Sequence, residues 1–182
     1  MTLLAAVTLL TACTSSVPQE PGTPSPSPTP TAATIRWDYP DVEGYALSED
    51  PPAPGVIELE NADAGCVLQL TDERLPGSAD DDTRATRDAI ENAMGSLGET
   101  SEVDRRQSDI TTDDGPLPAT EVSFTAVSGA QELDVRMMLR AVTADGVLVG
   151  IVHICPTGSI DEDVWSTFVA QTTLHGARAT TF

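Results

Sequence analysis

The chain has 182 residues, with 29 acidic residues against nine basic residues, and every basic residue is an arginine. The formal net charge of −20 argues against nucleic-acid binding, because the phosphate backbone repels an acidic surface. For the same reason we do not expect the folded part to lie flat on an anionic membrane.

Residues 1–12 are predicted to be a lipoprotein signal peptide. An apolar run over residues 3–10 leads into Leu10-Thr11-Ala12-Cys13, which matches the bacterial lipobox. Small residues there admit the signal peptidase, and only the thiol of Cys13 can take the diacylglyceryl group. The run is too short to span a bilayer. A secretory signal opens with a basic segment, and residues 1–12 have none, so we expect a truncated start.

The predicted lipidated Cys13 is followed by a linker that ends at residue 33. Six prolines alternate there with Ser and Thr, and almost nothing in the segment is apolar. Such a segment stays extended and solvated, and at polyproline II spacing it reaches up to about 60 Å. We therefore expect one domain over residues 34–182, anchored through the N-terminal lipid to the outer face of the cell membrane.

The two remaining cysteines, Cys66 and Cys155, form an even pair in a chain predicted to be extracytoplasmic. In that compartment two such residues commonly form a disulfide, which is the prediction here; two buried free thiols are the alternative. No CxxC motif is present and the two histidines are 22 residues apart. We therefore predict no metal site and no cofactor.

Alternating apolar residues and turn signals predict seven strands in the domain. Their ranges are 34–39, 56–60, 66–70, 102–111, 119–127, 132–142 and 147–154. The last of these is apolar on both faces, as expected for a strand covered on both sides.

Two helices are predicted from helical spacing of apolar residues. The first spans residues 82–97, with acidic residues at its start and Gly98 as its stop. The second opens with a capping box at Ser159-Ile160-Asp161-Glu162 and ends at Gly176. The fold class is therefore α+β, with a mostly antiparallel curved sheet of about six or seven strands flanked by two helices.

The element order, the opening motif Trp37-Asp38-Tyr39-Pro40-Asp41 and a terminal helix with Trp165 resemble the PsbP/Mog1-like fold. The similarity is greatest to actinobacterial envelope lipoproteins of that fold, and it covers residues 34–176. It implies a curved antiparallel sheet used as a binding or assembly module, with no catalytic residues. The Cys66 and Cys155 pair departs from many members.

No catalytic constellation emerges from the sequence, so we predict that the chain is not an enzyme. His153 and Cys155 share a strand face but suggest a dyad only weakly, and His175 is expected to end the second helix. The acidic runs 113–115 and 161–163 lack the ligand frame of a calcium loop and are predicted to be solvated turns.

Together these features predict a lipid-anchored extracytoplasmic binding or scaffolding module of the bacterial cell envelope. Its partners would be the membrane and an unidentified envelope protein or ligand. A secreted envelope hydrolase is one alternative, which requires a cleft with carboxylates, His153 or a free Cys155. The other is a carrier of an apolar ligand, which requires a cavity lined by Met137, Leu139 and Trp165.

Overall fold

The computed structural model describes residues 34–75 and 81–177, which belong to the second of the two units into which the chain divides, Ala32–Phe182. The predicted signal peptide, Cys13 and the linker lie outside the described residues. Within the described ranges, no helix is long and apolar enough to cross a membrane.

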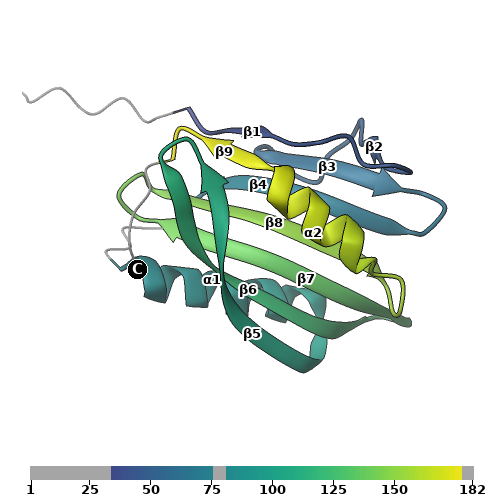
Figure 1. The fold of residues 1–182 in the computed structure, drawn as a ribbon. Coiled ribbons are helices and arrows are strands. Elements are labelled where there is room, and N and C mark those ends of the chain that lie inside the picture. The colour runs from purple at the N-terminus through teal and green to yellow at the C-terminus, as the bar shows by residue number, and fades with distance from the viewer. Residues whose placement is uncertain (1–33, 76–80, 178–182) are drawn as a thin grey trace, which may run out of the picture. The chain divides into compact units, whose positions relative to one another are not determined.

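The described residues form two helices and a nine-stranded sheet (Figure 1). The strands are β1 (Arg36–Asp38), β2 (Ala46–Leu47), β3 (Val56–Asn61), β4 (Cys66–Arg74), β5 (Glu99–Thr112), β6 (Gly115–Ser128), β7 (Gln131–Val142), β8 (Val147–Pro156) and β9 (Thr173–His175). The helices are α1 (Asp82–Leu97) and α2 (Glu162–Gln171). The strand order is β1-β9-β5-β6-β7-β8-β4-β3-β2. The α+β class is confirmed.

The sheet is larger than the predicted six or seven strands, and it is mixed. The seven predicted strands all form, but β2 and β9 were missed. They have two and three residues, too few for an alternating pattern to be detected. β9 pairs parallel with β5, at Thr111↔Thr173 and Thr112↔Leu174, whereas the other pairings are antiparallel.

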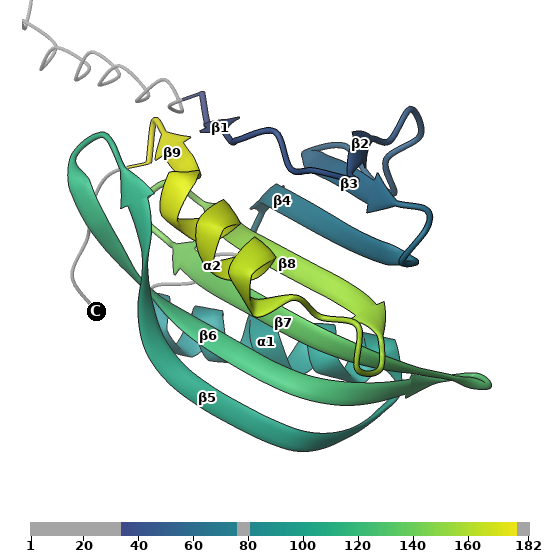
Figure 2. The ribbon, with the colours of Figure 1, turned by 45° about the vertical axis from the view of Figure 1, so that its right-hand side comes forward.

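The two helices cover opposite faces of the curved sheet, as the two views show (Figures 1 and 2). Trp165 and Phe168 of α2 are buried in the larger core, with residues of β3, β4 and β8 among their neighbours. Ile90 of α1 is buried in a second core with residues of β6 and β7, such as Phe124 and Leu139. Successive side chains along β7 and β8 therefore point alternately into the two cores.

The first helix is fixed at its N-terminus by capping and by a buried ion pair. The carboxylate of Asp81 accepts a hydrogen bond from the backbone N–H of Arg84 (2.8 Å), as an N-cap residue does. Asp82 pairs with the fully buried Arg140 of β7 (2.7 Å) and accepts from the backbone N–H of Thr143 (2.9 Å). Burial lowers the pKa of Arg140, and Asp82 opposes that effect. These contacts hold α1 against β7.

The predicted limits of the second helix were wrong at both ends. Asp161, rather than Ser159, caps it, because its carboxylate accepts from the backbone N–H groups of Asp163 and Val164. The helix stops at Gln171, and the next residues turn into β9 instead of continuing to Gly176. His175 therefore lies in a strand, not at a helix end, where it contacts carboxylates on both sides.

Candidate functional site

The first helix covers only part of its face of the sheet. α1 packs on β5, β6 and β7. The same face continues across β8 and β4, and the other helix of the described residues, α2, lies on the opposite face of these strands (Figure 2). On β8 this face carries Leu148, Val152 and Ile154, and all three are only half-buried.

A groove of about 790 Å³ runs between α1 and the exposed part of this face. Its floor is apolar and is made by β7 and β8: Met137, Leu139, Leu148, Val152 and Ile154. The volume lies within the range of small-molecule sites, which are concave and mainly apolar with a few polar groups.

The helix contributes one wall of the groove in two parallel rows at helical spacing. The row nearer the sheet is Ala85, Ala89 and Ala93. The row nearer the solvent is Arg84, Asp88, Asn92 and Ser96. Residues four apart lie on one side of a helix, so the first row forms a smooth apolar wall and the second a polar rim. Every second residue of β4, namely Gln69, Thr71 and Glu73, forms the opposite bank.

Two independent elements give the same length for the groove. At about 3.3 Å per residue, β8 from Leu148 to Ile154 spans about 20 Å. At 1.5 Å per residue, α1 from Ala85 to Leu97 spans about 18 Å. The exposed apolar floor is one strand wide, about 5 Å, because Met137 and Leu139 of β7 are buried and β4 presents polar side chains on the other side. The site is therefore long and narrow.

The charged groups at the groove are acidic on balance. Arg84 is the cation among the lining residues, against the carboxylates of Glu73 and Asp88. All three lie near the end marked by Leu148, since Glu73 is the register partner of Leu148 and Arg84 and Asp88 lie in the first half of α1. With the chain at −20, this end disfavours an anionic ligand group.

A buried polar cluster lies on the other face of the sheet, below α2. His153 is fully buried, with Nε2 hydrogen-bonded to the Tyr45 hydroxyl (2.8 Å) and 3.2 Å from the sulfur of Cys155. Its ring stacks on that of Trp165, with the centroids 6.4 Å apart. Burial, aided by the nearby Asp161, raises the pKa of Tyr45.

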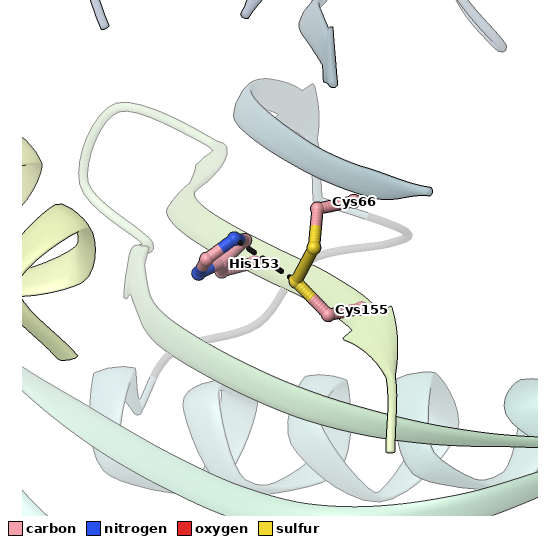
Figure 3. Close-up of side chains that lie close together, drawn as sticks. All are labelled: Cys66, His153 and Cys155. Atoms are coloured by element: carbon pink, nitrogen blue, oxygen red, sulfur yellow. Dashed lines mark hydrogen bonds between the residues drawn. A yellow bond between two sulfur atoms is a disulfide. The ribbon is translucent and has the colours of Figure 1, made fainter. Parts of the chain in front are cut away.

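Cys66 and Cys155 are bonded to each other, next to His153 (Figure 3). They occupy adjacent strands at the end of the β4–β8 ladder, which pairs Val67 with Ile154. The sulfurs and the imidazole lie within 4.8 Å of one another, a spacing that could hold a soft metal ion if the bond were reduced. In the disulfide neither sulfur is a thiolate, so the His153 and Cys155 dyad has no free nucleophile.

A carboxylate on the same face is paired rather than poised for acid–base chemistry. Glu121 is buried and accepts hydrogen bonds from Arg106 (2.7 and 3.0 Å), Arg136 (2.6 Å) and the indole of Trp165 (3.1 Å). Burial would raise the pKa of Glu121, but the two arginines outweigh it and hold the pKa below its ordinary value. Arg136 also pairs with Glu162 and lies over the Trp165 ring, so the network fastens α2 to the sheet.

Burial gives His153 a measurable effect on stability. Burial and the nearby Arg136 lower its pKa to about 4, from about 6.5 in the unfolded chain. Between these pH values only the unfolded state binds the proton, which favours unfolding. Above pH 6.5 His153 is neutral in both states and costs no stability, and the free energy of unfolding falls as the pH falls from 6.5 toward 4.

We therefore expect the free energy of unfolding to fall by about 2 kcal/mol more in the wild type than in His153→Phe between pH 7 and pH 5. Phe keeps a ring against Trp165 and does not titrate. Urea unfolding at the two pH values measures the difference. His153→Gln, which can still bond to Tyr45, serves as a second variant. Equal losses in wild type and both variants would contradict the assignment.

The residues predicted from the sequence to line one apolar cavity do not all meet in the structure. Met137 and Leu139 do line a cavity, but Trp165 does not join them, because it packs on the opposite face of the sheet. The acidic runs lie at the β5–β6 turn and at the start of α2. There Asp113 bonds to His175 (2.8 Å), and Asp161 caps the helix.

No known family model matches the chain, and no curated protein matches it. The solved structures similar to it include a protein of Bacteroides thetaiotaomicron, 10% identical with a TM-score of 0.49, covering 83% of this chain and 50% of that one. This chain thus spans about half the length of that protein. Another is LpqN of Mycobacterium tuberculosis, described as involved in cell envelope biogenesis, 14% identical with a TM-score of 0.46, covering 80% and 86%. The resemblance to PsbP/Mog1-like proteins stays a prediction.

Proposed function

We propose that the chain is a non-enzymatic binding module of the cell envelope, and that its groove holds one unbranched apolar chain, such as the acyl chain of a lipid. The observation that carries the proposal is the half-buried apolar strip of β8 beside the alanine wall of α1. Exposed apolar surface of this kind is costly in water and is commonly a binding site.

The dimensions favour an extended apolar chain over a protein helix. A helix with its side chains is about 10 Å across, twice the width of the apolar floor. The hydrocarbon core of a bilayer is about 30 Å thick and holds two layers of acyl chains, so one chain spans about 15 Å. A groove of about 18–20 Å accepts that length and leaves room for the first atoms of a head group.

The rim defines the kind of head group. Gln69, Asn92 and Ser96 offer uncharged donors and acceptors along the banks, and the carboxylates of Glu73 and Asp88 disfavour an anion. We therefore propose a lipid with an uncharged polar head as the ligand, in preference to a free fatty acid carboxylate.

The experiment is a fluorescence competition titration of the purified protein with a monoacylglycerol, the fatty acid of the same chain length, and a sterol. The proposal predicts saturable binding of the monoacylglycerol, weaker binding of the fatty acid at neutral pH, and no competition by the rigid sterol. Absence of saturable binding by the monoacylglycerol would exclude this function.

The predicted lipid on Cys13 would place the groove beside its ligand source. The linker predicted from the sequence would reach up to about 60 Å, so the anchor would keep the domain near the membrane. We expect Cys13→Ala to release a folded protein into the culture medium, with unchanged urea unfolding. Cell fractionation measures this, and membrane retention of the variant would contradict the anchor.

A further inference from the structure

The floor of the groove contains one position without a side chain. Gly150 lies between Leu148 and Val152 on β8, directly opposite Leu139 of β7 and Thr71 of β4. A methyl group at position 150 would overlap Cδ2 of Leu139 and would lie 3.0 Å from the carbonyl oxygen of Met138. The side chain of Leu139 thus lies flat across the glycine and forms the floor there.

A side chain at position 150 would change this arrangement at a single point. The backbone of Met138 and the β-sheet ladder cannot give way easily, whereas Cδ2 is the far end of a flexible side chain. Leu139 would therefore turn upward into the groove. At about 3.3 Å per residue, the obstruction would stand about 7 Å from Leu148 and about 13 Å from Ile154.

We infer that Gly150 keeps the groove continuous and so determines the length of the chain that it accepts. The inference rests on the proposed function and assigns this glycine as a specificity-determining residue. In the wild type, each additional methylene finds apolar floor until the groove is full. In Gly150→Ala, the part of the chain beyond the raised Leu139 stays in water.

The test compares dissociation constants for monoacylglycerols with chains of about eight to about sixteen carbons. Burial of one methylene strengthens binding about fourfold, so the wild-type affinity should rise steadily through the series. With the head group at the Ile154 end of the groove, we expect the rise for Gly150→Ala to stop near ten carbons. Six methylenes at about fourfold each then leave the sixteen-carbon chain about four thousandfold weaker than in the wild type. Gly95→Ala is the matched control, because a methyl group there meets nothing within 4 Å.

Two further variants keep the inference testable if Gly150→Ala folds poorly. The double variant Leu139→Ala/Gly150→Ala removes the leucine that would turn upward, and it should recover binding of long chains. Leu139→Ala by itself lowers the floor at the same place, and it should bind chains methyl-branched near their middle better than the wild type does.

The outcomes separate this inference from the proposed function. If the wild type binds none of the series, the proposed function fails and the inference fails with it. If the wild type binds with a steady rise and Gly150→Ala shows the same rise, only the role of Gly150 is overturned. The same holds if Leu139→Ala leaves the preference for unbranched chains unchanged.

Discussion

Val152→Glu is expected to weaken binding of a long monoacylglycerol about a hundredfold. Val152 lies in the middle of the groove floor, between Gln69 and Met137 in the sheet register, and is half-buried. A carboxylate at this point stays hydrated, and its water molecules prevent about four methylenes of the ligand from being buried. The loss of binding free energy is about 3 kcal/mol. Competition titration measures the change.

The fold should tolerate this substitution, because the open groove leaves the new carboxylate solvated. Leu47→Glu is the matched control, since it adds the same charge at a side chain that is 61% exposed on the short strand β2. It should bind as the wild type does. If both variants bind equally well, the ligand does not occupy the groove.

Replacing both disulfide cysteines is expected to have the largest effect on stability. Cys66 and Cys155 are 89 residues apart, and a crosslink over a loop of that size removes about 4–5 kcal/mol of chain entropy from the unfolded state. Domains of this size are stable by only about 5–15 kcal/mol. We therefore expect Cys66→Ala/Cys155→Ala to unfold at a much lower urea concentration.

A reducing agent provides the internal control for this prediction. Dithiothreitol should lower the unfolding midpoint of the wild type toward that of the double variant, and it should leave the double variant unchanged. Loss of less than about 1 kcal/mol in the double variant would show that the β4–β8 ladder, and not the covalent bond, fixes these strand ends.

Much of the fold could be predicted because long amphipathic elements repeat their pattern many times. The spacing of apolar residues predicts the first helix over residues 82–97, and the structure has it over Asp82–Leu97. Short elements give no such signal. β9 was mistaken for the end of the second helix, since Thr173–His175 follows an apolar helical stripe with no proline or glycine between them.

The groove is predicted only in part, because Met137 and Leu139 are expected to line an apolar cavity and do so, whereas Trp165 lies on the opposite face. Residues 147–154 are apolar on both faces, a pattern that predicts a strand covered on both sides. In the structure α2 covers one face, while Leu148, Val152 and Ile154 on the other are only partly covered. Sequence periodicity shows that a strand has two apolar faces, but it cannot show which strands a helix of limited width will cover.

The most direct test of the proposed function is photocrosslinking of the purified protein with a monoacylglycerol that carries a diazirine in its chain, followed by peptide mass mapping. We predict labelled peptides from α1 and β8, with labelling abolished by excess unlabelled monoacylglycerol. Labelling confined to peptides around Tyr45 and Trp165 on the opposite face, or labelling that the competitor does not reduce, would contradict it.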